Sequence, residues 1–417
     1  MKIRILLFIP FIALLLNSCG QQQAETEVAN EPTIEEAEAL AKKFIITDGH
    51  VDLPFRLVVQ MFRFQKIMED VSQETDGNFD YVKAKEGGLD APFMSIYIPS
   101  SRQKDGTAKV LADSLIDIVE ELPTKYPDKF ALAKTPEDIK ANFDKGLISL
   151  PMGMENGAPI MDDIANVEYF YNRGIRYITL THGKDNQICD SSYDTTYVWN
   201  GVSPFGEEVV KEMNRVGIMV DVSHISDSSF YDVMKLTKAP VIASHSSCRE
   251  FTPDFERNMN DDMIKELGKN GGVIQINFGS TFLDGALQEK SRANREKIRA
   301  YMEENNLQRG DSALVAYTKE VNAANNPYSD VQKVADHIDH VVELAGIDHV
   351  GFGSDFDGVG DSLPEGLKDV SEYPNLIFEL MKRGYSEEDI EKICYKNVFR
   401  VWSEVSQIAA DLQKESV

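Results

Sequence analysis

Cysteine, histidine and tryptophan are scarce in this sequence, with four, seven and two residues among 417. Cys19 lies near the N-terminus, and the other three cysteines, Cys189, Cys248 and Cys394, are too widely spaced for a Cys-x-x-Cys motif. We therefore do not expect a cysteine-based zinc or redox site. A disulfide between two of the three stays open, because an oxidising compartment would permit any of the pairings.

Basic residues are also in the minority. Against 69 Asp and Glu there are 43 Lys and Arg, which gives a formal net charge of −26. This balance argues against nucleic acid as a partner and against a polybasic patch on a membrane surface. The glycines of residues 351–358 do not follow Gly-x-Gly-x-x-Gly, and neither a Walker nor a Gly-x-Ser-x-Gly pattern occurs. A dinucleotide site and a serine nucleophile of the elbow type are not expected.

An apolar stretch at residues 5–16 follows two basic residues and is too short for a stable transmembrane helix. It predicts a secretory signal peptide over residues 1–19. The segment LNSC that ends at Cys19 resembles a bacterial lipobox, although its asparagine is not the usual small residue, and simple secretion is the alternative. We predict an exported bacterial lipoprotein, held on the periplasmic or cell-surface side of a membrane by lipid on Cys19. Residues 20–33 would be a flexible tether.

Residues 34–417 alternate between short apolar, β-branched runs and segments of helical period, which predicts one domain with a parallel sheet. Eight such units indicate an α/β fold, a (β/α)8 TIM-like barrel, whose active site lies at the C-terminal ends of the strands. The predicted strands are residues 44–48, 93–98, 148–152, 177–180, 217–222, 241–244, 272–278 and 350–353. The predicted helices between them include residues 108–122, 167–173, 206–215, 227–236, 261–269 and 328–344.

Two insertions interrupt this alternation. Residues 53–90 follow the first strand and could cover the mouth of the barrel, and residues 281–327 precede the last strand and read as an extra helical element. Insertions of this length are more often lids or binding loops than passive connections. Extra C-terminal helices are predicted at residues 373–383 and 386–412, with Gly384 ending the first.

Histidines and carboxylates follow the predicted strands, where a barrel places its active site. His50 and Asp52 are two residues apart, so they point to the same face of a strand. The full set is His50, Asp52, Glu155, His182, His224, His245 and Asp355. Imidazoles and carboxylates suit zinc or a similar divalent ion. One carboxylate can bridge two such ions, roughly 3.5–4 Å apart, which together activate a shared hydroxide.

A single histidine at a strand end is more often a hydrogen-bonded structural residue, so the metal prediction depends on the convergence of the whole set. Asp221 lies three residues before His224 and so on the opposite strand face, where a structural or supporting role is expected. We interpret His337, His340 and His349 as structural, because two lie on a predicted helix and the third precedes a strand.

These residues lie in segments that resemble the membrane (renal-type) dipeptidases, zinc peptidase family M19, over about residues 44 to 405. The matching segments include DGHVDLP (48–54), MGMENG (152–157), YITLTHG (177–183), DVSHIS (221–226), SHSSCR (244–249), RNMNDD (257–262) and GFGSDFDG (351–358). Several long segments in the same order make the resemblance specific. One departure is Met94, which stands where the family often has Trp and bears on side-chain preference rather than on the reaction.

The resemblance implies a metalloprotease with two Zn²⁺ ions. His50, Asp52 and Glu155 would hold one zinc, and Glu155, His224 and His245 the other. The substrates implied are dipeptides with a free C-terminal carboxylate, L-L and, as an open question, L-D. The family is often homodimeric.

The resemblance also implies the remaining roles. A metal-bridging hydroxide would attack the peptide bond, Asp355 would pass the proton of the attacking water to the leaving amine, and His182 would polarise the substrate and stabilise the oxyanion. Arg257 would bind the substrate carboxylate. It is placed by the Arg-Asn-x-x-Asp-Asp pattern, and Arg249 is the competing candidate.

Two other functions are less consistent with the sequence. A different binuclear barrel hydrolase, such as an amidohydrolase for cyclic amides or phosphotriesters, usually has His-x-His on strand one and a carboxylated Lys on strand four. This sequence has His-x-Asp and no Lys directly before His182, and it offers Glu155 as the bridge. A binding lipoprotein on an inactive scaffold should have lost a ligand, and none is lost here. The active peptidase is therefore favoured.

Overall fold

Eight parallel strands form one sheet in the order β1-β2-β5-β6-β7-β8-β9-β10. The computed structural model describes residues 31–59, 68–308 and 310–415, so the predicted signal peptide and Cys19 lie outside the described residues. The strands are β1 (Ile46–Val51), β2 (Leu89–Tyr97), β5 (Met152–Glu155), β6 (Ile175–Thr179), β7 (Met219–Asp221), β8 (Ile242–Ser246), β9 (Val273–Ile276) and β10 (Val350–Phe352). Every strand residue except Tyr97 is buried, as expected for a sheet covered on both faces.

Hydrogen bonds beyond the last strand bring the sheet close to a full circle. The backbone N–H of Asp355 donates to His50 O at 3.1 Å, and that of Asp52 donates to Phe356 O at 2.9 Å. The fully buried Asp48 carboxylate accepts from the Ser354 N–H at 3.0 Å. The predicted (β/α)8 TIM-like barrel is confirmed as a nearly closed barrel.

Helices surround this barrel. In the order of the chain they are α1 (Ile34–Lys43), α5 (Ala108–Lys125), α6 (Pro136–Phe143), α7 (Ala165–Asn172), α8 (Pro204–Val216), α9 (Asp227–Leu236), α10 (Asp261–Asn270), α14 (Val331–Ala345) and α15 (Tyr373–Lys382). Several begin with a side-chain cap; for example, Ser226 Oγ accepts from the Ser229 N–H at the start of α9. Gly384, at a φ of 88°, follows α15, as the sequence predicted.

The C-terminal helix α17 (Asn397–Glu415) contributes to the core of the barrel. Its Trp402 is buried in a cluster with Phe93 and Tyr177, and the Phe93 ring lies 5.4 Å from each of the other two. The sequence predicted one helix over residues 386–412. The structure has α16 (Glu387–Glu391), a π-helical turn (Lys392–Lys396) and then α17.

The third predicted strand, residues 148–152, is wrong in its bounds. Pro151 divides it, since proline has no N–H for a sheet. The first part, β4 (Ile148–Leu150), pairs with β3 (Phe130–Leu132) in a separate two-stranded sheet. The second part, β5, enters the barrel and ends at Glu155.

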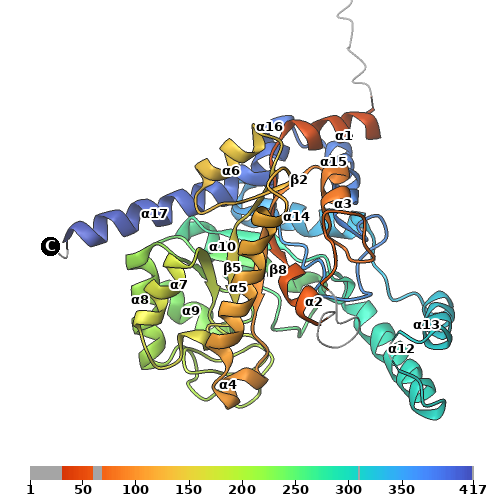
Figure 1. Cartoon of the computed structure of the whole chain (residues 1–417), viewed down its shortest axis with the longest axis horizontal. Helices are drawn as coiled ribbons and strands as arrows, with labels where there is room; N and C mark the ends of the chain where they lie inside the picture. Colours follow the sequence, from red (N-terminus) through yellow and green to blue (C-terminus); the bar gives the residue numbers. More distant parts are fainter. Residues whose placement is uncertain (1–30, 60–67, 309, 416–417) are drawn as a thin grey trace, which may run out of the picture. The chain divides into compact units, whose positions relative to one another are not determined.

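Both insertions contain helices. The first, residues 53–90, includes α2 (Leu53–Val59) and α3 (Tyr81–Gly87). The second includes α11 (Ser280–Leu283), α12 (Gly285–Glu304) and α13 (Ser312–Ala324), and α12 and α13 lie side by side (Figure 1). The stacked rings of Tyr301 and Tyr317 join these two helices. A short helix α4 (Ser101–Asp105) follows β2.

Cys189, Cys248 and Cys394 are buried and free, so no two of them form a disulfide in this structure. Among the described residues, no helix combines the length and the apolar character needed to cross a bilayer.

Candidate metal centre and active site

The five predicted metal ligands and the two predicted catalytic residues, His182 and Asp355, converge at the C-terminal ends of the strands. His50 lies inside β1 and Asp52 directly after it, while Glu155 is the last residue of β5 and His245 lies in β8. The turns after β6, β7 and β10 carry the other three, His182, His224 and Asp355. Within this set, ligand atoms of three groups lie within 4.8 Å of one another: His50, Glu155 and His245; Glu155, His182 and His224; and His50, Asp52 and Asp355.

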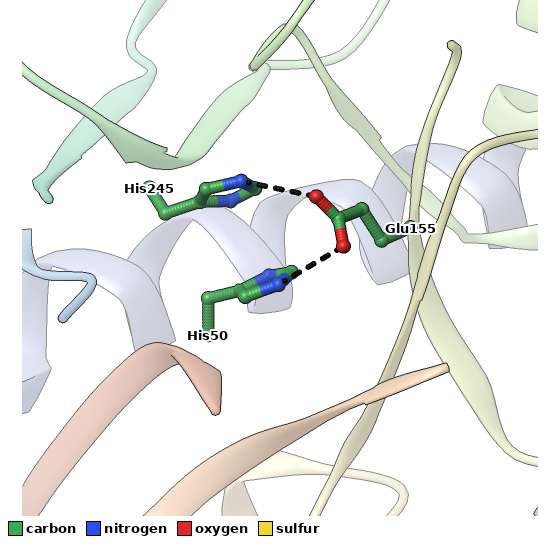
Figure 2. Close-up of side chains that lie close together, drawn as sticks. All are labelled: His50, Glu155 and His245. Carbon is green, nitrogen blue, oxygen red and sulfur yellow. Dashed lines mark ion pairs between the residues drawn. The ribbon is translucent and has the colours of Figure 1, made fainter. Parts of the chain in front are cut away.

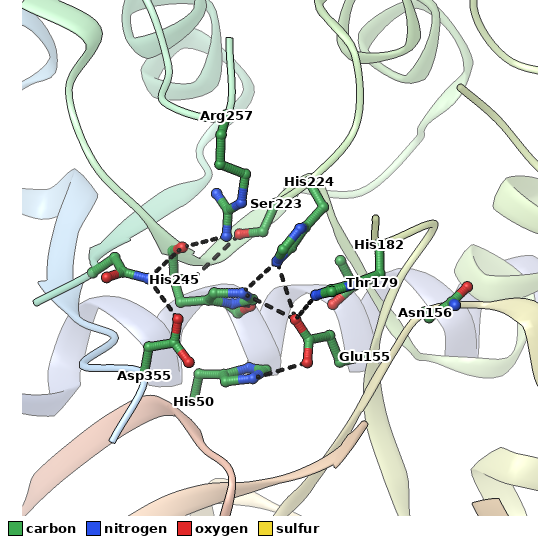
Figure 3. A network of polar contacts seen from close by, with 12 residues as sticks. His50, Glu155, Asn156, Thr179, His182, Ser223, His224, His245, Arg257 and Asp355 are labelled. Atoms are coloured by element: carbon green, nitrogen blue, oxygen red, sulfur yellow. Dashed lines mark hydrogen bonds and ion pairs between the residues drawn. The ribbon is translucent and has the colours of Figure 1, made fainter. Parts of the chain in front are cut away.

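Glu155 is at the centre of the cluster, and its two oxygens face different neighbours (Figure 2). Oε2 lies 3.4 Å from His50 Nε2, which is itself 3.6 Å from Asp52 Oδ2. Oε1 lies 3.0 Å from His224 Nε2, 3.3 Å from His245 Nε2 and 3.4 Å from His182 Nε2 (Figure 3). The carboxylate therefore lies between His50 on one side and three imidazoles on the other.

The tautomer of His50 follows from its hydrogen bonds. The Tyr177 hydroxyl donates its single proton to Gly49 O at 2.9 Å, so it can only accept from His50 Nδ1, also at 2.9 Å. Nδ1 then carries the ring proton, and the lone pair of Nε2 faces Glu155. This nitrogen is buried without a hydrogen-bond partner, as a metal-binding nitrogen would be.

A parallel arrangement orients His245. The Ser244 hydroxyl donates to Asp221 Oδ2 at 2.6 Å and therefore accepts from His245 Nδ1 at 2.8 Å. Asp221 also accepts from the Thr179 hydroxyl. The supporting role expected for Asp221 agrees with these contacts, because Asp221 holds the hydroxyl group that orients His245.

Burial and charge within the cluster favour a cation. Burial lowers the pKa of His224 and of His245 well below the usual range, so both rings are neutral and able to ligate. Their Nε2 atoms face each other at 2.8 Å. Burial opposes protonation of His50 as well, but Tyr177, Glu155 and Asp52 raise its pKa well above the usual value. A bound dication would be ligated by these Nε2 atoms and by the carboxylate oxygens beside them, so the residues present are suited to hold a metal ion.

The two carboxylates respond differently to burial. Burial alone would raise the pKa of Glu155, but His182 and His50 lower it well below its ordinary value. Burial raises the pKa of Asp355 well above its ordinary value, and His50 only partly offsets this. Asp355 Oδ2 accepts a hydrogen bond from Asn277 Nδ2 at 2.8 Å, which fixes its position.

The backbone is strained at the two turns that carry His224 and Asp355. Their φ angles are 70° and 63°, in the left-handed region that non-glycine residues seldom adopt. Such strain is typical of functional sites, where a side chain is aimed at the cost of backbone energy.

Arg257 is buried behind the cluster, where Nη1 donates to Ser246 Oγ at 2.7 Å and Nη2 to His245 O at 2.8 Å (Figure 3). It forms no ion pair with a carboxylate of the described residues. The competing Arg249 forms a two-pronged ion pair with Asp227, at 2.8 and 2.6 Å, and is therefore already neutralised. Of the two arginines, Arg257 is therefore the one whose charge is still available to an anionic ligand.

A cavity of about 620 Å³ opens onto the cluster. Besides Asp52, Glu155, His182, His224 and Asp355, it is lined by Phe55, Arg56, Val59, Tyr97, Tyr193, Thr281, Phe282, Arg295, Asp357, Gly358, Val359 and Ser362. The expectation that the first insertion covers the barrel mouth agrees with the α2 side chains in this wall. Met94 is fully buried in β2 and is not among the lining residues.

The sequence analysis assigned no role to Tyr177, Asn277 or the aromatic cavity wall, although Tyr177 begins the matching segment YITLTHG. The three histidines interpreted as structural have partners outside the cluster. His337 accepts from the Cys248 N–H at 3.0 Å, His340 contacts Asp261 at 2.8 Å, and His349 donates to Gly272 O at 2.7 Å.

Comparison with known proteins identifies the family. Residues 34–416 match the family described as membrane dipeptidase (peptidase family M19). An uncharacterized dipeptidase of Schizosaccharomyces pombe is 34% identical over 389 residues, which cover 90% of this chain and 84% of that protein.

Solved structures agree in fold. The probable dipeptidase PvdM from Pseudomonas aeruginosa is 27% identical, with a TM-score of 0.75 over 90% of this chain and 99% of that one. A metallo peptidase from Rhodobacter sphaeroides, liganded with a phosphinate mimic of the dipeptide L-Ala-D-Ala, is 23% identical, with a TM-score of 0.70 over 87% and 99% of the two chains. The chain belongs to the membrane dipeptidase family, the metallopeptidase family M19.

Proposed function

We propose that this protein uses two divalent cations to hydrolyse the peptide bond of dipeptides that have a free C-terminal carboxylate. Zinc is the cation that we propose. One observation carries the proposal: the oxygens of Glu155 face separate groups of ligands. Oε2 lies 3.4 Å from His50 Nε2, whereas Oε1 lies 3.0 Å from His224 Nε2 and 3.3 Å from His245 Nε2. A carboxylate in this position is suited to bridge two cations.

His50, Asp52 and Glu155 would hold the first cation, and Glu155, His224 and His245 the second. Imidazole nitrogens and carboxylate oxygens are zinc ligands, and they also accept neighbouring divalent metals. When bound, the two cations supply an activated water as nucleophile and positive charge for the developing oxyanion.

Asp355 and His182 would act directly on the substrate and the attacking water. Asp355, held by Asn277, would accept the proton of the water and deliver it to the leaving amine. His182 lies at the cavity wall, with Nε2 3.4 Å from Glu155 Oε1, and would donate to the carbonyl oxygen as charge develops there.

Arg257 would hold the free carboxylate of the substrate. Its Nε is buried and has no hydrogen-bond partner, and its guanidinium lacks a counter-ion among the described residues. A buried charge without a counter-ion gains most from an ionised ligand, here through a charge-assisted hydrogen bond. Recognition of a carboxylate next to the scissile bond would restrict cleavage to dipeptides.

The test uses the protein without residues 1–19, reconstituted with zinc. We expect close to two metal ions per chain and hydrolysis of Leu-Leu but not of its C-terminal amide. Glu155→Gln should lose metal and activity with an unchanged circular dichroism spectrum. The control variant His340→Gln, which changes a histidine outside the cluster, should keep metal and activity. Arg257→Ala should lower kcat/KM for Leu-Leu by about 30-fold or more.

Three results would contradict the proposal. Two metals and wild-type turnover in Glu155→Gln would remove the bridging role. Equal cleavage of Leu-Leu and its amide would remove carboxylate recognition, and metal binding without any dipeptide cleavage would indicate another barrel hydrolase.

We also propose that the protein is exported as a bacterial lipoprotein and anchored to a membrane through lipid on Cys19. The LNSC segment after a short apolar stretch supports this. Incorporation of a fatty-acid analogue should be lost in Cys19→Ser, and the protein should be released from the membrane fraction. A variant that stays bound to the membrane would exclude the anchor.

A homodimer, frequent in the family, is testable by sedimentation equilibrium.

A further inference from the structure

A line of ring contacts runs from the first insertion to the second, and all of its rings except that of Phe255 line the cavity. In order, the ring centroids are 4.9 Å apart for Phe55 and Tyr97, 4.9 Å for Tyr97 and His182, 4.3 Å for His182 and His224, 5.9 Å for His224 and Tyr193, 6.1 Å for Tyr193 and Phe255, and 5.5 Å for Phe255 and Phe282. His182 and His224 stand in the middle of this line. The cavity therefore has two ends, one on each side of the reacting groups.

The two ends differ in chemistry. Phe55, Val59 and Tyr97 make the end beside α2 apolar and aromatic. The opposite end is built around Phe282, whose ring centroid lies 5.4 Å from Arg257 Cζ. Because Arg257 is the proposed binder of the substrate carboxylate, this second end receives the C-terminal residue of a dipeptide.

The second insertion also contributes Thr281 and Arg295 to the cavity wall. α12, which carries Arg295, is tied to α11 by a hydrogen bond from Gln288 Nε2 to Thr281 O at 3.0 Å. Arg295 donates one hydrogen bond, from Nη1 to Ser291 Oγ at 3.0 Å, and forms no ion pair within the described part of the chain. The Thr281 hydroxyl likewise has no hydrogen bond to a described residue.

Arg56, the other arginine in the cavity wall, differs in this respect, because it pairs with Asp357 and Glu69 at 2.9 Å each. Arg295 thus supplies an unpaired positive charge in a chain whose net charge is −26. Such a chain repels anionic substrates at long range, so a local cation has a large influence on whether they bind.

We propose that Arg295, with Thr281, selects dipeptides whose C-terminal residue has an acidic side chain and whose N-terminal residue is apolar. The inference rests on the proposed function, since Arg257 defines which end of the cavity is C-terminal. The side-chain carboxylate of Asp or Glu accepts from the guanidinium and the hydroxyl, while the N-terminal side chain packs on Phe55 and Tyr97.

The test compares kcat/KM for Leu-Glu and Leu-Gln, which differ in one charge. We expect wild type to favour Leu-Glu about five- to tenfold, within the range of a partly exposed charge-assisted contact. The preference should fall as NaCl rises from 50 to 500 mM, because the contact is open to screening. Glu-Leu and Gln-Leu should be cleaved equally, since the arginine at the N-terminal end, Arg56, is already paired with Asp357 and Glu69.

Arg295→Gln should abolish the ratio between Leu-Glu and Leu-Gln. Arg292→Gln is the matched control: it removes the same charge one turn earlier on α12, from a side chain that is paired with Glu289 and does not line the cavity. Equal rates for Leu-Glu and Leu-Gln in wild type, or a preference that survives Arg295→Gln, would overturn the inference alone. Failure to cleave any of the four dipeptides would overturn the proposed function and this inference with it.

Discussion

Two hydroxyl groups orient the histidines of the candidate metal centre without facing the cavity. Tyr177 accepts from His50 Nδ1 and Ser244 from His245 Nδ1, so each leaves an Nε2 lone pair towards Glu155. Each hydroxyl is itself fixed by a further acceptor, Gly49 O or Asp221. We infer that these two hydroxyls set metal affinity, as the outer contacts of ligating histidines commonly do.

Tyr177→Phe should therefore weaken metal binding by about 10- to 100-fold, because His50 can then place its proton on either nitrogen. Competition with a chromophoric chelator measures this directly, without reference to activity. Tyr171→Phe is the control, since the Tyr171 hydroxyl has no hydrogen bond to a described residue. Unchanged metal affinity in Tyr177→Phe would mean that packing alone orients His50.

A residue of the candidate site could be predicted from the sequence only if it lies at the C-terminal end of a strand. His50, Glu155 and Asp355 could be predicted as site candidates because a parallel barrel collects its strand ends in one place. Tyr177 could not, because it lies inside β6 and reaches His50 only across the barrel. Its ring passes over Gly153, where a Cβ would lie 1.9 Å from the ring, and a sequence does not reveal that proximity.

Among the elements, the first insertion is joined to the turn after β10 by Arg56 and Asn78. Arg56, on α2, donates to Asp357 Oδ1 and to Phe79 O at 2.9 Å each. Asp357 belongs to the turn after β10 and also accepts from the Asn78 N–H at 2.7 Å. Since Phe55 and Val59 of the same helix line the cavity, this ion pair also holds part of the cavity wall in place.

Arg56→Leu should lower the free energy of unfolding by about 3–5 kcal/mol, because it leaves Asp357 buried without its counter-charge. Asp357→Leu in the same chain should recover much of that loss, which a double-mutant cycle from urea unfolding would measure. Strictly additive losses would show that the two side chains act independently.

The alternation of helices and strands in the barrel was predictable from apolar periodicity, but the second sheet and the π-helical turn were not. Pro151 separates β4 from β5 and sends β4 to a second sheet, which local sequence does not indicate. The π-helical turn before α17 places the Cys394 carbonyl where it accepts from the Thr47 hydroxyl at 2.8 Å. The two partners lie far apart in the sequence, so no local pattern reveals this contact.

For the molecule as a whole, the apolar core of the barrel and the candidate metal centre lie in different places. Trp402 of α17 packs with Phe93 and Tyr177 in an apolar cluster, and the polar cluster lies at the strand ends. Tyr177 belongs to both, since its ring is in the apolar cluster and its hydroxyl contacts His50. Metal binding is therefore expected to stabilise the entire domain and not only the site.

Removal of metal should accordingly lower global stability. A ligand present at 1,000 times its dissociation constant adds about 4 kcal/mol to the free energy of unfolding. Chelation should shift the urea midpoint by the corresponding amount, and zinc should restore it.

In Glu155→Gln the zinc-dependent part of the free energy of unfolding should shrink, because the bridging charge is lost, whereas His340→Gln should retain it in full. The apo form of Glu155→Gln should be at least as stable as apo wild type, since the buried carboxylate no longer lacks a cation. Equal zinc-induced shifts in wild type and Glu155→Gln would contradict a centre organised around that carboxylate.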